Sequence, residues 1–191
     1  HLTFDALVDR ALAYCDWAVA NGLLAIRSHV DTSDASMLAV EALLAVKKFG
    51  GVIAQHAQDP LLTNGSQMNS GALSTELGLK GWPAIAEESI IERDALLAEE
   101  TGSRLHICHL TTAGAVEVVR WAKKRGINIT AEATPHHLML TEEEVRSYDP
   151  VYKVNPPLRT KEDTLALRAA VLDGTIDVIG TDHAPHSKEK K

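Results

Sequence analysis

Apolar residues follow two alternating patterns along the chain, one with the period of a helix and one typical of short buried strands. Leu7, Ala11, Tyr14 and Ala18 recur at helical spacing, and Asn21-Gly22 then forms a helix stop. Short apolar runs bounded by glycine are typical of buried parallel strands. The patterns predict helices at 3–20, 37–48, 115–124, 142–147 and 162–172, another starting at 82–83, and strands at 23–26, 52–54, 104–110, 127–131 and 176–180.

Strands that alternate with helices in this way indicate an α/β protein in which helices connect the strands of a parallel sheet. No internal repeat and no shift in composition divides the chain, so residues 1–191 are expected to form a single α/β domain. The polar stretch between residues 55 and 81 is too long for an ordinary connection, which predicts a functional loop over a site. In the helix that starts at 82–83, we expect Ile85, Ile90, Ile91, Leu96 and Leu97 to face inward.

Composition narrows the classes of partner. The formal net charge of −7 argues against nucleic-acid and anionic-membrane partners. No apolar run approaches the roughly 20 residues that span a bilayer, and no secretory signal is visible. The sequence holds 2 cysteines, too few for a disulfide framework, which favours a reducing cytoplasm.

Polar side chains gather where the predicted strands end, at the edge where ligands of parallel α/β proteins bind. Taken singly, a histidine at a strand end is more often a hydrogen-bonded structural residue than a metal ligand. His56, His109 and Asp182 come from separate strands, however, and together they make a typical ligand set for catalytic Zn²⁺. Alternation along a strand separates His106 from His109, so we expect His106 to pack against a helix. The sequence contains no HExxH, GxSxG, P-loop, GxGxxG or paired CxxC motif.

Long, ordered motifs carry a resemblance to a known family. They are GVIAQHAQDP, GLKGWPAIAEESIIERD, RLHICHLTTAGAVEVVRWAKKRGINITAEATPHHLMLT, YKVNPPLR and GTIDVIGTDHAPHSKEK. Across residues 49–191 the chain resembles bacterial class I dihydroorotases of the amidohydrolase superfamily. The resemblance implies a metal-dependent (βα)8 barrel that reversibly cyclises N-carbamoyl-aspartate to dihydroorotate in pyrimidine biosynthesis.

The resemblance also implies roles for individual residues. His56 and His109 resemble the family's metal ligands, with Zn²⁺ as the cofactor, and Asp182 resembles the carboxylate that binds metal and transfers the proton. Asn155 and His186 resemble substrate-binding positions. The family's HxH motif, which supplies further metal ligands, has no counterpart in this sequence.

Residues 1–48 are instead similar to an internal stretch of cytosine-deaminase-like amidohydrolases, which suggests a chimera or a fragment. Asp31 or Asp34, with His29 nearby, would take the place of a further metal ligand. Five parallel strands cannot close an eight-stranded barrel. Completion of this partial barrel by a second copy, or rearrangement to an open doubly wound sheet, would relieve the exposed edges.

Three functions remain open at this point. The first is a dihydroorotase-type cyclic amidohydrolase that binds a small-molecule substrate and forms a homo-oligomer. The second is a non-catalytic engineered or chimeric barrel-fragment scaffold, which the missing HxH motif favours. The third is a cytosine-deaminase-like hydrolase, supported only by residues 1–48.

Overall fold

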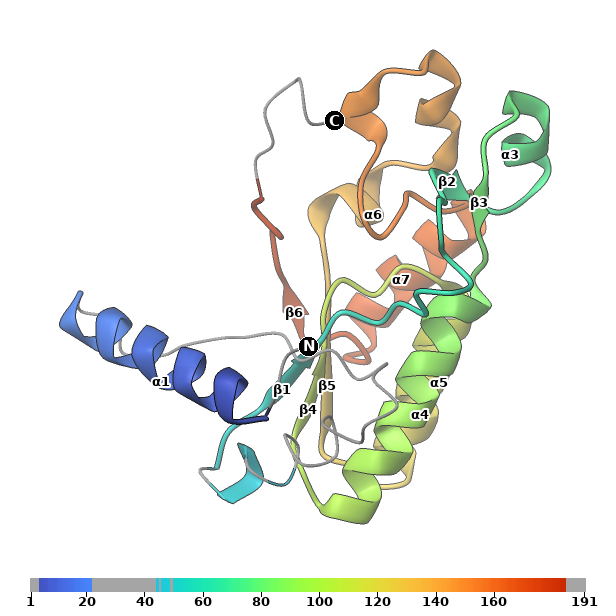
Figure 1. Ribbon diagram of the computed structural model, residues 1–191. Helices are drawn as coiled ribbons and strands as arrows, with labels where there is room; N and C mark the ends of the chain where they lie inside the picture. The colour runs from blue at the N-terminus through green and yellow to red at the C-terminus, as the bar shows by residue number, and fades with distance from the viewer. Residues whose placement is uncertain (1–3, 22–43, 45, 49, 185–191) are drawn as a thin grey trace.

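The structure is a computed structural model that describes residues 4–21, 44, 46–48 and 50–184 (Figure 1). The predicted strand at 23–26 lies outside the described residues, as do the candidate site residues His29, Asp31, Asp34 and His186. The predicted first helix is present as α1, Phe4–Ala20. Of the helix predicted at 37–48, only a few residues at its end are described, and these are helical.

A parallel sheet of four strands organises the described part of the chain. The strands are β1 (Ile53–Gln55), β4 (Leu105–Ile107), β5 (Ile129–Ala133) and β6 (Val178–Ile179). Their order across the sheet is β1-β4-β5-β6, so each strand pairs with the one that precedes it in this sheet. A doubly wound sheet reverses its strand order at a switch point, whereas a barrel adds strands in one direction. The alternative of an open doubly wound sheet is therefore wrong for the described strands, and the arrangement is part of a barrel.

Helices cover one face of this sheet. They are α4 (Ile85–Thr101), α5 (Ala113–Lys124) and α7 (Lys161–Leu172), which lie together beside the strands in Figure 1. Leu105 and Ile107 of β4, with Ile129 and Ala131 of β5, belong to the buried core together with apolar residues of these helices. Thr112 and Thr160 are the N-cap residues of α5 and α7. Their hydroxyls accept hydrogen bonds from backbone N–H groups in the first turn of each helix.

The predicted inward face of α4 is correct only in part. Ile90 and Ile91 are buried and Leu97 packs against the core, but Ile85 is 54% and Leu96 45% exposed. The helix begins at Ile85 rather than at residues 82–83. Its buried stripe continues through the small residues Ala95 and Ala98, which a search for large apolar side chains overlooks.

The long segment that follows β1 has secondary structure of its own. β2 (Met68–Asn69) pairs in parallel with β3 (Gly81–Trp82), and α3 (Ala72–Leu77) connects them. After β5 come α6 (Pro135–Met139), η1 (Glu142–Ser147) and η2 (Pro150–Tyr152), so the short helix predicted at 142–147 is present as a 3-10 helix. Among the described residues, no helix has the length and apolar character needed to cross a membrane.

Candidate metal centre at the strand ends

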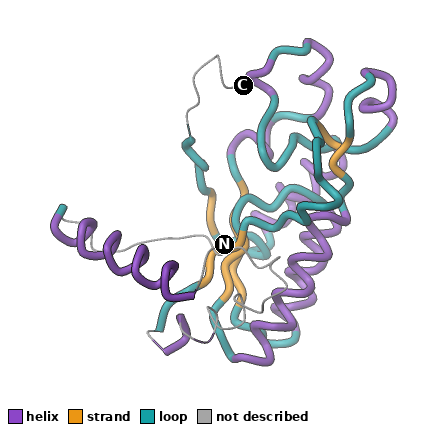
Figure 2. Tube along the Cα trace, in the orientation of Figure 1, coloured by secondary structure: helices purple, strands orange, loops and turns teal. Residues whose placement is uncertain are grey.

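The loops that follow the parallel strands gather at one end of the sheet (Figure 2). His56 follows β1 directly, His109 follows β4, and Asp182 follows β6. His136 and His137 lie on α6, immediately after β5. The strand-end positions predicted from the sequence are therefore confirmed for His56, His109 and Asp182, and four adjacent strands of the sheet contribute to one edge.

His56 and His109 face each other across this edge. Nδ1 of His56 lies 2.8 Å from Nε2 of His109, and the ring centroids are 4.7 Å apart at an interplanar angle of 79°. On its other side, Nε2 of His56 lies 2.8 Å from the carbonyl oxygen of the Gln58 side chain. Because that oxygen only accepts, His56 carries its proton on Nε2 and presents the lone pair of Nδ1 toward His109.

The orientation of Gln58 is itself fixed by its neighbours. Its amide nitrogen donates to Oγ1 of Thr63 at 2.8 Å, and Asn155 donates to its carbonyl oxygen at 3.4 Å. This chain of contacts connects the candidate metal ligand His56 with the candidate substrate residue Asn155.

The backbone explains why His109 turns toward β1. His109 has φ of 35°, so the extended conformation of the strand does not continue through this residue. The flanking amides remain in the sheet: Cys108 donates to the carbonyl of Gln55, and Leu110 donates to that of Glu132. A buried imidazole is thus held at the end of a strand by a backbone conformation that non-glycine residues seldom adopt.

The prediction that His106 packs against a helix is wrong. Leu105 and Ile107 take the helix-facing positions, so His106 projects from the opposite face, where the parallel register sets it beside Thr130. Its Nδ1 lies 2.8 Å from Oγ1 of Thr130, and its Nε2 lies 3.3 Å from a carboxylate oxygen of Glu132.

Cys108 and Glu132 complete a group that sequence reasoning missed. One ligand atom each from His106, Cys108 and Glu132 lies within 4.8 Å of the others, and among the described residues no further group of three His, Cys, Asp or Glu meets this distance. Consequently His56, His109 and Asp182 have at least one pair of ligand atoms farther apart than 4.8 Å. The even spacing of residues 106 and 108 on one strand was the signal that could have revealed this group.

A polar cavity of about 370 Å³ opens beside the His56–Gln58 contact. Asp182 and Asn155, which the sequence assigns to catalysis and substrate binding, both line it. Asp182 is exposed, lies outside regular secondary structure and has φ of 48°. The other lining residues come mainly from the segment after β1 and from the loops after β5: Gln58, Thr63, Ser66, Gln67, Met68, Trp82, His136, Lys153, Val154, Pro157 and Ala184.

The two histidines of α6 differ in their surroundings. Burial lowers the pKa of His136, while the negative charge of Asp182 opposes that shift. Burial lowers the pKa of His137 further, to about 3, with the neighbouring His136 acting in the same direction. His137 contacts the hydroxyl of Thr134 at 2.7 Å and the carbonyl of Pro156 at 3.0 Å, so it holds the cavity-forming loop as a neutral imidazole.

A buried arginine holds Trp82, one of the residues that line the cavity. Arg159 donates to Oγ1 of Thr111 at 3.0 Å, to Oδ1 of Asn69 at 2.9 Å and to the carbonyl of Trp82 at 2.8 Å. It also pairs with the buried carboxylate of Glu87, which accepts from both the backbone and the hydroxyl of Thr111. One side chain therefore connects β2, β3, α4 and the loop after β4.

Comparison with known proteins places this arrangement in a family. The family described as Dihydro-orotase-like matches residues 14–115. Dihydroorotase from Streptomyces coelicolor is 70% identical over 150 residues, which are 78% of this chain and 35% of that protein. Dihydroorotase from Syntrophobacter fumaroxidans is 45% identical over 187 residues, covering 98% of this chain and 43% of that protein. The chain thus spans less than half the length of these curated relatives.

Solved structures agree on the fold. The chain resembles the D-hydantoinase (dihydropyrimidinase) from Thermus sp. with a TM-score of 0.75 and 25% identity, covering 94% of this chain and 41% of that one. The L-hydantoinase (dihydropyrimidinase) from Arthrobacter aurescens gives a TM-score of 0.70 and 26% identity, covering 85% and 38%.

These comparisons do not support a separate origin for residues 1–48. The family match begins at residue 14, within that segment. A single dihydroorotase aligns with 187 residues of the 191, so it spans most of residues 1–48 as well as the remainder. The chain belongs to the dihydro-orotase-like family of amidohydrolases.

Proposed function

We propose that the residues at the strand ends of this chain form part of a dihydroorotase active site. A dihydroorotase reversibly hydrolyses dihydroorotate to N-carbamoyl-L-aspartate. The observation that carries the proposal is the His56–His109 pair beside a polar cavity lined by Asn155 and Asp182. Membership of the dihydro-orotase-like family supports this substrate over other cyclic amides.

The donor set of this edge fits Zn²⁺, which imidazole nitrogens and carboxylate oxygens bind readily. His56 and His109 would hold the ion, since their ring nitrogens converge from adjacent strands. Gln58 would orient His56 by accepting its Nε2 proton. A bound zinc ion would lower the pKa of a water molecule and polarise the carbonyl of the substrate ring.

Asp182 would transfer the proton. Its carboxylate lies on the cavity wall, within reach of solvent and of a bound substrate. In the hydrolytic direction it would take a proton from the attacking water and give it to the ring nitrogen as the amide C–N bond breaks. Asn155 would donate to a polar group of the substrate, and His186 would bind the substrate carboxylate.

The direct test measures metal content and turnover on the 191-residue chain. After incubation with Zn²⁺, the protein is expected to retain zinc and to hydrolyse dihydroorotate. His56→Ala should lose the zinc, and Asp182→Asn should retain it while losing turnover. His183→Asn, which changes an exposed neighbour of Asp182, serves as the control. Zinc retention unchanged in both His56→Ala and His109→Ala would overturn the assignment of the ligands.

A non-catalytic role is the second candidate, favoured because the ligand atoms of His56, His109 and Asp182 do not all lie within 4.8 Å of one another. Zinc binding without turnover at high protein concentration would support it. Turnover that depends on Asp182 would exclude it.

We also propose that the chain acts as a homo-oligomer in the cytoplasm, without nucleic-acid or membrane partners. Val178 and Ile179 of β6 are exposed, and β6 is an outer strand of the described sheet. Such an edge is suited to pairing with a second copy. Cys108 is buried and is not part of a disulfide, which suits a reducing compartment. Light scattering that gave a monomeric mass would count against the oligomer.

A further inference from the structure

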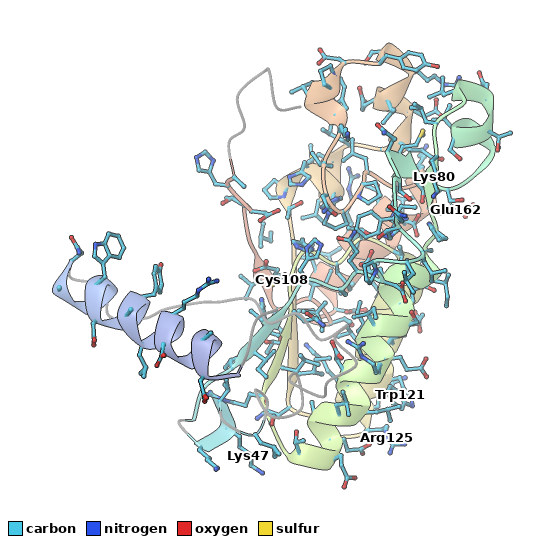
Figure 3. The ribbon with its side chains drawn as sticks, viewed as in Figure 1. Lys47, Lys80, Cys108, Trp121, Arg125 and Glu162 are labelled. Atoms are coloured by element: carbon cyan, nitrogen blue, oxygen red, sulfur yellow. The ribbon has the colours of Figure 1, made fainter. Side chains whose placement is uncertain are left out.

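We propose that His106, Cys108 and Glu132 form a second metal site, beneath the strand-end pair and on the face of the sheet opposite the helices. The three side chains come from adjacent strands, with His106 in β4, Cys108 directly after it and Glu132 in β5. Cys108 lies at the centre of the molecule, near the ends of the strands (Figure 3). A thiolate, an imidazole and a carboxylate together favour a borderline-soft divalent ion such as Zn²⁺.

The distances suit such an ion. In a tetrahedral zinc site, a nitrogen and an oxygen ligand at their usual bond lengths lie about 3.4 Å apart. Nε2 of His106 and the carboxylate oxygen of Glu132 are 3.3 Å apart. The thiol of Cys108 belongs to the same group, in which all three ligand atoms lie within 4.8 Å. Three ligands leave a fourth position for a water molecule.

The surroundings already orient the His106 ligand. Its Nδ1 lies 2.8 Å from Oγ1 of Thr130, the residue opposite it in the parallel register. When Nδ1 donates its proton to that hydroxyl, Nε2 directs a lone pair at the Glu132 carboxylate. The nitrogen lone pair and the carboxylate oxygen then repel each other unless a proton or a cation lies between them. In metal-binding histidines, the ring nitrogen that does not bind the metal commonly donates to a neighbouring acceptor, as Nδ1 of His106 would to Thr130.

Burial confines the carboxylate to this place. Glu132 and Cys108 are both buried, and a β-carbon added at Gly180 would lie 2.7 Å from a carboxylate oxygen of Glu132. Because Gly180, which directly follows β6, has no side chain, the carboxylate of Glu132 can lie against the backbone there. A buried carboxylate is costly unless a hydrogen bond or a cation balances its charge. His106 already contacts this carboxylate at 3.3 Å, and a bound metal ion would be a second source of positive charge beside it.

The site differs from the strand-end pair in one measurable property, because it contains sulfur. The set His56, His109 and Asp182 offers only nitrogen and oxygen. Titration of the full chain with Co²⁺ should therefore produce a thiolate-to-metal charge-transfer absorption in the near ultraviolet. Cys108→Ser should abolish that absorption. Cys15→Ser, which removes the other cysteine in the sequence, should leave it unchanged.

Two further variants separate this site from the proposed zinc centre and from a loss of folding. His56→Ala should keep the thiolate absorption, because His56 is outside the group. Thr130→Val keeps the side-chain shape but removes the hydroxyl, and should weaken Co²⁺ binding at the thiolate site roughly tenfold. Circular dichroism confirms that each variant is folded.

The outcomes decide the proposal without reference to turnover. Absence of the charge-transfer absorption in the wild-type chain would overturn it, as would its persistence in Cys108→Ser. Loss of the absorption in His56→Ala would show one shared metal site rather than two. Failure of dihydroorotate hydrolysis, by contrast, bears only on the strand-end centre.

Discussion

Arg159 and Glu87 form an ion pair at 3.3 Å between side chains that are only 2% and 3% exposed. Burial raises the pKa of Glu87, and the guanidinium of Arg159 opposes that shift. The pair is joined to Thr111, Asn69 and Trp82 by the other guanidinium contacts. Removal of either partner would leave the other charge buried without its counter-charge.

Arg159→Met should therefore destabilise the protein by about 3–5 kcal/mol, the usual cost of breaking a buried pair from one side. Urea denaturation measures the change. Arg146→Met is the matched control, because Arg146 pairs with Glu76 and Glu143 on the exposed surface, where solvent screens ion pairs and they contribute little to stability. If the two variants lost equal amounts of unfolding free energy, burial of the Arg159–Glu87 pair would not explain the loss in Arg159→Met.

The depressed pKa of His137 predicts a loss of stability in acid. The folded state keeps the ring neutral down to about pH 3, whereas the unfolded chain protonates it below the ordinary histidine pKa of 6.5. The unfolded state then binds more protons, so the free energy of unfolding falls as the pH falls, by up to about 1.4 kcal/mol per unit. The loss extends from about pH 6.5 toward pH 3, and the full contribution is present above 6.5.

Comparison of wild type with His137→Asn between pH 7 and pH 5 isolates this contribution from the carboxylates, which titrate mostly lower. The variant should show a flatter dependence of its unfolding free energy on pH. Parallel curves for the two proteins would refute the assignment to His137.

Gln58 should control zinc affinity through His56. Gln58→Ala removes the acceptor of the Nε2 proton and should weaken zinc binding about tenfold. Gln67→Ala changes another glutamine on the same cavity, but one without a contact to His56 among the described interactions. Isothermal titration with Zn²⁺ distinguishes them, and equal affinities would show that Gln58 does not orient the ring.

Gly180 should tolerate no side chain. In Gly180→Ala the new methyl group would meet the carboxylate of Glu132 at 2.7 Å, which should cost about 1–3 kcal/mol. Gly71→Ala is the control, because the nearest atom to its added carbon is 3.9 Å away. Thermal unfolding of both variants tests the difference; a larger loss in Gly71→Ala would contradict this account.

The sequence predicted the parts of the fold that depend on local patterns. Strand and helix alternation and the gathering of His56, His109 and Asp182 at one edge follow from apolar periodicity and from the geometry of parallel strands. The orientation of His106 could not be deduced in this way, because it depends on which alternate residues face the helices. Arg159 was missed for a related reason: its partners are distant in sequence and meet only through tertiary packing.

The backbone at His109 marks a second limit of local reasoning. Its positive φ stops the strand alternation, so the positions of residues from His109 onward cannot be read from period-two spacing. The expectation that His106 and His109 do not point in the same direction was nonetheless correct. Only the environment of His106 was assigned wrongly.

The sequential order of β1, β4, β5 and β6 also bears on how the chain is made. Each of the later strands docks on a strand that the ribosome has already released, so this sheet can grow in the direction of synthesis. Among the described strands of this sheet, β4, β5 and β6 each pair with a strand that precedes them in the chain. Only β1, which begins the series, must wait for a later strand before it can pair. Synthesis at about 5–20 residues per second then allows one strand–helix unit to pack before the next emerges.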